Sequence, residues 1–315
     1  MSRTLEIRVG ALATATALAL SRAALDAPLL VDAELSVVEL TTAATVLGAF
    51  QRHHGAADDR PLLRRGSGGP FVRVAPGTLH VMLRLKHPAA LVPCDARRIV
   101  NRHVRPLLRG LTRTGALAHY FGRDWISVAH RPVGQVGFAH DTRTQRTVFE
   151  AFVAIAEPVV PSGRGSLLGK EPGTLASVTG RDFDARVVCG RIVDAYAELD
   201  GCERRDGVLE CVGPDVTELG NDPPWAATSE EAIGTIGAGV DRAGVLRLGG
   251  DLLASRDALD RVAARVSALS RTDLLPEASA EAVGAIVDEE LSGSHVALDG
   301  VRSMASLRDV LVRAM

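Results

Sequence analysis

The sequence has few aromatic residues, little net charge and no long hydrophobic run, and each shortage excludes a class of protein. Aromatic residues make up 3% of the 315 positions, too few for the stacking platforms that bind single-stranded nucleic acids. The net charge of −2 argues against a general electrostatic nucleic-acid binder. No stretch approaches the roughly 18 apolar residues of a membrane-spanning helix, so neither nucleic acid nor membrane is an expected partner.

Cysteine and histidine are present, but not in metal-binding patterns. Cys94, Cys189, Cys202 and Cys211 form no Cys-x-x-Cys pair, and the nine histidines include no His-Glu-x-x-His. The sequence therefore predicts no metal site formed by these motifs. A chain of this length does not need disulfides to fold, which makes a reduced, cytoplasmic setting the expectation.

The first 25 residues allow two interpretations. The apolar run from Val9 to Leu20 follows two arginines, as the core of a secretory signal peptide does. Against this, Glu6 lies in the basic segment and the helical pattern continues past Leu20. We expect a short strand at residues 5–9 and then a buried alanine-rich helix, with a cleaved signal as the alternative.

Apolar spacing and turn residues predict an α+β protein of two domains, residues 1–222 and residues 223–315. The prolines and glycines of residues 213–227 mark the linker. In the first domain we expect strands at residues 28–50 (two), 78–85, 118–136 and 147–155, and helices at about 95–111 and 184–199. In the second we expect a glycine-rich hairpin sheet at residues 234–253, followed by helices at about 259–269, 280–291 and 303–315.

The most suggestive segment is Arg64-Arg65-Gly66-Ser67-Gly68-Gly69. Glycines let backbone N–H groups approach an anion and form a nest. The two guanidiniums offer bidentate contacts to phosphate or carboxylate. A plain glycine-rich turn between two strands explains the same residues, so the loop alone does not decide between a ligand site and a turn.

The order of several motifs along the chain carries more information. The arginine-serine-glycine loop is followed by Gly77 and an apolar strand, then by Gly122-Arg123-Asp124, a strand that runs to Gly134, and a glycine-rich loop before Leu175 to Val178. Gly249-Gly250-Asp251 and three helices complete the series. This series resembles the lipoate–protein ligase family, within the biotin/lipoate ligase and octanoyltransferase superfamily, over nearly the whole chain.

The resemblance implies a fold, an activity and a site. The fold is a mixed-sheet ligase-type catalytic domain with flanking helices, plus a small α+β accessory domain. The activity is ATP- and Mg²⁺-dependent conversion of lipoate, octanoate or a related acid to an acyl-adenylate. The acyl group then passes to a lysine of a lipoyl-carrier domain or another protein acceptor. The implied ligand-binding residues are Arg64, Arg65, Ser67, Gly68, Gly69, Gly77, Gly122, Arg123, Asp124, Gly134 and Ser177, and the implied catalytic residues are Arg131 and Lys170.

Departures from the family pattern leave a second interpretation open. The family's motif lysine is replaced by Arg131, with Lys170 as a possible substitute in space. Pro70 stands where a glycine is usual and removes one N–H donor, and Trp125 replaces an acid. None of the cysteines matches an acyl-accepting position. The chain is therefore interpreted either as a ligase, with the same or a changed substrate, or as an inactive relative that binds an acyl ligand, a nucleotide or a protein partner.

An observation that separates these interpretations is the state of the ligand tunnel. An open apolar tunnel reaching Arg65, Gly68 and Arg131 would favour an acyl ligand. A tunnel filled by side chains such as Phe71, Trp125 or Phe138 would favour a binding or scaffold role.

Overall fold

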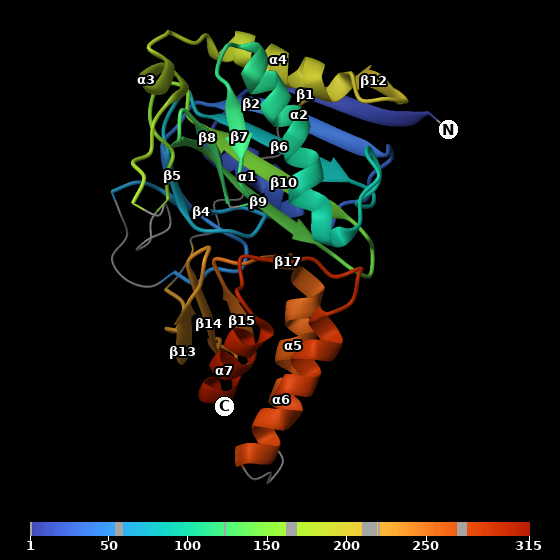
Figure 1. Cartoon of the computed structure of the whole chain (residues 1–315), viewed down its shortest axis with the longest axis vertical. Helices are drawn as coiled ribbons and strands as arrows, with labels where there is room; N and C mark the ends of the chain where they lie inside the picture. Colours follow the sequence, from blue (N-terminus) through green and yellow to red (C-terminus); the bar gives the residue numbers. More distant parts are fainter. Residues whose placement is uncertain are drawn as a thin grey trace.

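The computed structural model describes residues 2–53, 59–122, 124–161, 169–209, 219, 221–269 and 276–315. A large mixed sheet forms the centre of the molecule, and a smaller unit lies below it in Figure 1. This arrangement confirms the predicted α+β class.

The large sheet has ten strands drawn from both halves of the chain. Its strands pair in parallel at β12–β1–β2 and β9–β16, and antiparallel elsewhere. The order is β12 (Cys202–Asp206), β1 (Arg3–Leu12), β2 (Ala33–Leu40), β6 (Leu79–Leu85), β10 (Thr147–Val153), β9 (Arg131–His140), β16 (Leu253–Ser255) and β17 (Leu298–Asp299), while β8 (Trp125–Val128) pairs with β9 and with β7 (Ala118–Tyr120).

Two helices, α2 (Ile99–Arg113) and α4 (Ala185–Ala197), cover one face of this sheet. The apolar positions of α2 recur at helical spacing and pack into the largest core cluster. A single 3₁₀ turn, η1 (Ala96–Arg98), leads into α2. The Asp184 side chain accepts a hydrogen bond from the Arg186 N–H at 2.8 Å and caps α4. Both predicted helices are thus confirmed.

The opposite face of the sheet packs against α1 (Thr14–Ala23) and a smaller four-stranded sheet. Aliphatic side chains from both sheets and from α1 form a separate core here. The small sheet has the order β11 (Val160–Pro161), β5 (Val72–Val74), β3 (Ala44–Leu47) and β4 (Leu62–Arg64). A short helix, α3 (Leu175–Thr179), follows β11 along the chain.

The C-terminal residues form a unit with a core of its own. Its three-stranded sheet is β13 (Ala227–Glu230), β14 (Thr235–Val240) and β15 (Leu246–Gly250), and its helices are α5 (Arg256–Leu269), α6 (Pro276–Leu291) and α7 (Met304–Ala314). The unit is not independent, because β16 and β17 continue the large sheet beyond β9. The boundary at residue 222 stays a prediction, since residues 210–218 and 220 lie outside the described part.

The N-terminal run differs from the expected helix. Residues 9–12 belong to β1, and the helix begins only at Thr14. Pairing explains the difference, because β1 aligns with β2 from Leu5 through Leu12 and gains ladder hydrogen bonds that a helix would forgo. In the part of the chain that is described, no helix has the length and apolar character needed to cross a membrane.

Candidate functional site

The arginine-serine-glycine loop joins β4 to β5 and lies against β9 at Gly137. A Cβ atom at Gly137 would stand 2.4 Å from the Gly68 carbonyl oxygen and 2.7 Å from Ser67 Oγ. Glycine is therefore required on β9 for the loop to reach this depth. Ser67, Gly68 and Gly69 are buried as a consequence.

The four backbone N–H groups of the loop all donate to protein acceptors. In this conformation the loop offers no free backbone nest, which differs from the anion cradle that its glycines suggested. The donors and acceptors are Gly66 N to Ser21 Oγ at 2.6 Å, Ser67 N to Glu150 Oε2 at 3.0 Å, Gly68 N to the Phe138 carbonyl at 2.9 Å, and Gly69 N to the Leu252 carbonyl at 2.7 Å.

The two arginines of the loop have different surroundings. Arg64 is half-buried, donates to the Gly48 carbonyl at 3.1 Å and lies 3.5 Å from an Asp222 carboxylate oxygen. Arg65 is only 1% exposed. Its Nη2 donates to the Gly68 carbonyl at 2.9 Å and the Pro70 carbonyl at 3.0 Å. Arg65 thus holds the loop from within.

Two buried polar atoms at this place have no hydrogen-bond partner among the described residues. They are Arg65 Nη1 and Ser67 Oγ. A Cβ atom at Gly137 would lie 3.3 Å from Arg65 Cζ and 2.7 Å from Ser67 Oγ, so both side chains converge on the same glycine. Buried donors left unbonded cost free energy, and one acceptor oxygen between them would satisfy both.

A buried, hydrogen-bonded histidine–glutamate pair lies under the loop. His80 Nε2 on β6 is 2.7 Å from Glu150 Oε1 on β10, and the His80 ring stacks on Phe152 at a centroid distance of 4.9 Å. Burial opposes ionisation of Glu150, but hydrogen bonds from His80 and Ser67 and the charge of Arg65 lower its pKa to about 2. Glu150 is therefore a carboxylate at neutral pH and fixes the loop through the Ser67 N–H.

Two further carboxyl groups interact electrostatically with the guanidinium of Arg65. Asp124 is buried and accepts a hydrogen bond from Gln135 Nε2. Asp251, after β15, accepts from the Thr235 N–H at 2.7 Å, and its burial raises its pKa to about 6. Burial lowers the pKa of Arg65 below its ordinary value, and the charges of Glu150, Asp124 and Asp251 offset part of this effect.

The two residues expected to be catalytic lie elsewhere. Arg131 Nη2 donates to the Pro172 carbonyl at 3.0 Å, and Lys170 Nζ donates to the His130 carbonyl at 3.1 Å. They are brought together at the β8–β9 turn. Arg131 is six positions before Gly137 on β9, which is roughly 20 Å along a strand. The structure therefore does not bring Arg131 or Lys170 to the Arg65 loop.

The remaining predicted residues have local structural contacts. Ser177 Oγ accepts from the Thr174 N–H at 2.9 Å in the capping box of α3. Gly77 and Gly122 have positive φ angles of 82° and 73°, which favour glycine. A Cβ at Gly134 would lie 2.7 Å from the Phe152 carbonyl. Arg123 lies outside the described residues.

The aromatic residues named for the tunnel are mostly interior. Trp125 is 3% exposed and Phe138 is fully buried in the core under the helices, whereas Phe71 is half-buried. Phe152 was not singled out from the sequence. The centroid of its ring lies 5.6 Å from Arg65 Cζ. His80 was also missed, and its signal was a titratable residue inside the apolar run of residues 78–85.

No protein-family model matches the chain, and no curated protein matches its sequence. Solved structures do match. A bipartite lipoate protein ligase from Thermoplasma acidophilum is 15% identical, with a TM-score of 0.52, over 65% of this chain and 88% of that one. LipL1 of P. falciparum in complex with lipoate is 11% identical, with a TM-score of 0.58, over 83% of this chain and 88% of that one.

Lipoate-protein ligase A bound with ATP gives a similar result. It is 13% identical, with a TM-score of 0.51, over 67% of this chain and 90% of that one. At these identities the likeness concerns the fold alone. The mixed sheet, its flanking helices and the covered C-terminal elements give this chain the fold of the lipoate–protein ligases.

Proposed function

We propose that this chain binds a small neutral acyl group of the lipoyl or octanoyl class at the Arg65 loop, and that ATP-dependent ligation is not its activity. The observation that carries the proposal is the pair of unbonded buried groups, Arg65 Nη1 and Ser67 Oγ. An acyl carbonyl oxygen is an acceptor that satisfies both at once.

The charges around Arg65 favour a neutral acceptor over a free carboxylate. Glu150, Asp124 and Asp251 all act on this one guanidinium. A ligand carboxylate would add a fourth acidic group to the same buried region, where like charges repel strongly. An amide or ester carbonyl brings the needed acceptor without that repulsion.

ATP and Mg²⁺ do not fit the residues present. The loop N–H groups that would receive a phosphate donate to Ser21, Glu150, Phe138 and Leu252 instead. The two cations that would stand in for the family lysine are bound to carbonyl oxygens at the β8–β9 turn. No group of three or more metal-ligating side chains occurs among the described residues. We therefore derive no step through a nucleotide.

Calorimetry with lipoamide and octanamide, compared with lipoate and octanoate, tests the proposal. We expect the amides to bind more tightly than the acids. Ser67→Ala removes a hydroxyl that has no partner among the described residues, so it should preserve the fold while weakening amide binding about fivefold, the value of one hydrogen bond. Ser127→Ala, on β8 and also buried, is the matched control. Absence of amide binding, or equal binding by both serine variants, would refute the proposal.

Ligation is the second candidate, and the C-terminal unit favours it. The likeness to LipL1 extends over 83% of this chain, which includes part of that unit, and an accessory domain implies an adenylation cycle in the family that the sequence resembles. The acceptor in that case is a lipoyl-carrier domain. Its intact mass after incubation with this protein, ATP, Mg²⁺ and lipoate or octanoate decides the question. We expect no change, and an ATP-dependent gain of one acyl group would replace our proposal with ligation.

A further inference from the structure

The outer side of α2 carries a row of arginines, which begins one residue before the helix. The row occupies one side of the helix, because its members are separated by four, three, four and four residues. It is about 22 Å long, from the rise of an α-helix per residue. Four of the five side chains are exposed and one is half-buried, while the other side of α2 packs into the core. We call this row the α2 arginine stripe, and its members are Arg98, Arg102, Arg105, Arg109 and Arg113.

The centre of the stripe lacks acidic partners. Arg102, Arg105 and Arg109 form no ion pair with a described residue, and the chain around them is described without a gap from residue 59 to residue 122. Among the described residues only the two ends of the stripe are paired. The pairs are Arg98 with Asp95 at 3.7 Å and Arg113 with Glu198 at 2.6 Å.

The arginines of α5 are placed differently. Each of the three lies within 2.8 Å of a carboxylate oxygen: Arg256 with Asp26, Arg261 with Asp257 and Glu290, and Arg265 with Glu289 and Glu290.

The charges of the stripe lower the stability of α2 itself. Like charges at i, i+3 and i, i+4 repel one another. Arg97 and Arg98 also precede a first turn that contains no acidic residue, and cations at a helix N-terminus oppose the helix dipole. Departures from such local rules are expected where a surface has a function. An anionic partner would remove both penalties.

A hollow of about 410 Å³ adjoins the C-terminal end of the stripe. Arg113 belongs to its lining, together with Phe183 and Val187. Val187 is apolar and yet 55% exposed. Asp182 and Asp184 also line the hollow, and their charges would repel a phosphate group there. The hollow therefore suits an apolar side chain at the end of an acidic segment.

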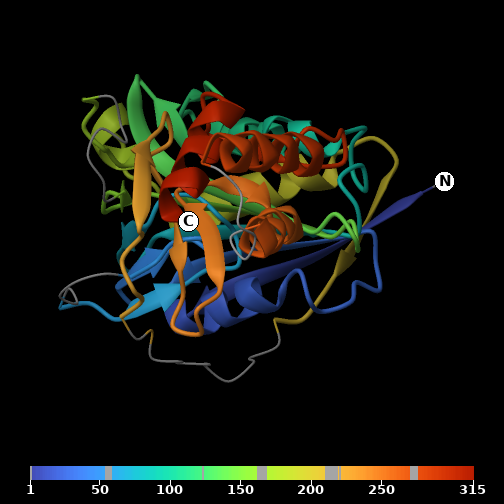
Figure 2. The same cartoon turned by 90° about the horizontal axis from the view of Figure 1, so that it is seen from below.

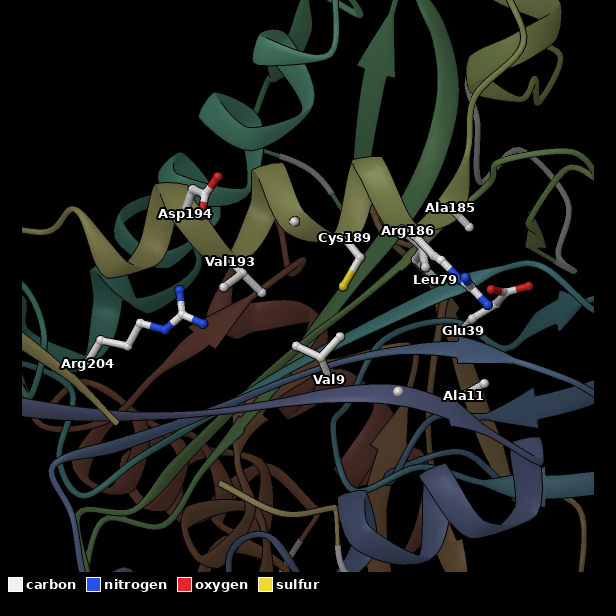
Figure 3. Close-up of a pocket in the computed structure, with 12 residues that line it drawn as sticks. Val9, Ala11, Glu39, Leu79, Ala185, Arg186, Cys189, Val193, Asp194 and Arg204 are labelled. Carbon is white, nitrogen blue, oxygen red and sulfur yellow. The ribbon is translucent and has the colours of Figure 1, made fainter. Parts of the chain in front are cut away.

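A larger pocket of about 510 Å³ on the same face of the sheet lacks this charge preference. It lies between β1 and α4, and Figure 3 shows Val9 on β1 and Cys189 on α4 on its opposite sides. Its charged residues are two bases and two acids, Arg186, Arg204, Glu39 and Asp194. The stripe, in contrast, selects an anionic partner.

Three kinds of anionic partner can be compared. A membrane surface would gain from exposed apolar residues along the stripe, and α2 exposes no large apolar side chain. A nucleic acid would bring its phosphates against the two aspartates of the hollow. A protein helix with carboxylates at i, i+4, i+7 and i+11 repeats the spacing from Arg98 to Arg109, because both helices have the same period.

We propose that the α2 arginine stripe binds an acidic helix of a partner protein. The carboxylates of that helix pair with the stripe, and an apolar side chain at its end enters the hollow beside Val187. Guanidinium and carboxylate groups form bidentate pairs, and the exposed pairs should be weakened strongly by salt. The stripe lies on the helical face of the sheet, so the proposal does not depend on the function proposed for the Arg65 loop.

The test measures binding of a synthetic helical peptide to the full chain by fluorescence anisotropy. The peptide is alanine-based, with glutamates at i, i+4, i+7 and i+11 and a leucine at one end. A second peptide has the same composition but distributes its glutamates around the helix. Reversal of the three central arginines to glutamate should weaken binding of the first peptide about tenfold or more. The matched control is the triple reversal Arg205→Glu, Arg242→Glu and Arg308→Glu, which changes the net charge equally at exposed positions elsewhere.

The proposal expects tighter binding of the first peptide than of the second, loss of binding in the stripe variant and retention in the control. Val187→Asp should weaken binding as well, since it places a carboxylate in the hollow. Thermal denaturation should show no loss of stability in the stripe variant, because its like charges are relieved.

Equal binding of the two peptides, equal losses in the two triple variants, or absence of saturable binding would overturn the proposal. So would tighter binding of a short DNA duplex, or of vesicles of phosphatidylglycerol and phosphatidylcholine, if reversal of the stripe abolished it, because the partner would then be a nucleic acid or a membrane.

Discussion

The two faces of the large sheet differ in how far they are buried and hydrogen-bonded within the protein. On the face toward the small sheet, the Arg65 loop is buried and its four N–H groups are bonded within the protein. On the helical face, Val9 is 52% exposed beside a mostly apolar pocket between β1 and α4. Figure 2 shows the same molecule from below, with the C-terminal unit in front of the sheet.

The difference shows which groups on each face are left to contact a ligand. At the Arg65 loop, Arg65 Nη1 and Ser67 Oγ have no hydrogen-bond partner among the described residues, and one acceptor atom would serve both. On the helical face a pocket of about 510 Å³ lies between β1 and α4, and its walls are mostly apolar. The predictions below either break or sharpen this contrast between a closed polar site and an open apolar pocket.

Loss of Glu150 should produce the largest effect. Glu150→Ala leaves His80 and the Ser67 N–H buried without their acceptor, so the free energy of unfolding should fall by about 3–5 kcal/mol. Urea titration followed by circular dichroism measures it. Glu203→Ala is the control, because the Glu203 carboxylate is exposed, 3.5 Å from Arg205, and exposed pairs contribute at most about 1 kcal/mol. Equal losses in both variants would contradict the closed polar site.

A methyl group at Gly137 should disturb the same face. Gly137→Ala sets a Cβ atom 2.4 Å from the Gly68 carbonyl oxygen, and the loop must move away from β9. We expect a loss of about 1–3 kcal/mol in the free energy of unfolding, together with faster amide exchange of Gly68 and Gly69. Hydrogen exchange read by mass spectrometry measures the second effect. Unchanged exchange in this loop would show that it is not held by close contact with β9.

Asp251 should make stability depend on pH. Its pKa is about 6 in the folded chain, against 3.8 ordinarily, so the folded state binds the proton more tightly. Its stabilising contribution is complete below about pH 4 and is lost as pH rises through about 6. Asp251→Asn should therefore be more stable than the parent by about 1–2 kcal/mol at pH 8 and show no such gain at pH 4. A constant difference across this range, in urea titrations at each pH, would contradict the assignment.

On the helical face, an added methyl group on α4 should raise the free energy of unfolding. A Cβ atom at Gly190 meets nothing within 4 Å, and glycine within a helix costs about 0.5–1 kcal/mol relative to alanine. Gly190→Ala should raise the free energy of unfolding by about that amount, opposite in sign to Gly137→Ala. Thermal denaturation of the two variants in parallel measures the contrast. A loss of stability at Gly190 would mean that the pocket is more tightly filled than its geometry indicates.

Much of the secondary structure followed from local sequence. The apolar spacing of residues 100–111 predicted α2, residues 184–199 were predicted to contain the helix seen as α4, and the apolar run at 78–85 predicted β6. The hairpin sheet after residue 234 and the helices after it were also predicted. These elements depend on periodicity and capping, which neighbouring residues encode.

Other elements escaped prediction because their reason lies far along the chain. Residues 202–206 form β12 by pairing with β1, and residues 253–255 form β16 by pairing with β9 and β17. The run of residues 9–12 favoured a helix by composition and became strand by pairing with β2. Strand partners of this kind are separated by tens to hundreds of residues, and no local sequence pattern identifies which strands will pair.

The candidate site was likewise predicted only in part from the sequence. The sequence singled out Arg65, Ser67 and the glycines around them, because a chain with these residues in one loop can surround an acceptor. It also matched Arg131 and Lys170 to that site, whereas they contact carbonyl oxygens at the β8–β9 turn. His80 and Phe152 were left unassigned, although they lie beneath the loop.

By itself the sequence determined the α+β class, most of its helices and strands, and the loop in which two unbonded donors lie. Tertiary structure alone decided that the loop N–H groups are used internally, because their acceptors on Ser21, Glu150, Phe138 and Leu252 arrive from four distant segments. It also decided that residues 202–206 form a strand, because they pair with β1 from Arg3 to Ile7. A hydrogen bond depends on where its partner is in space, and spacing along the chain does not fix that position.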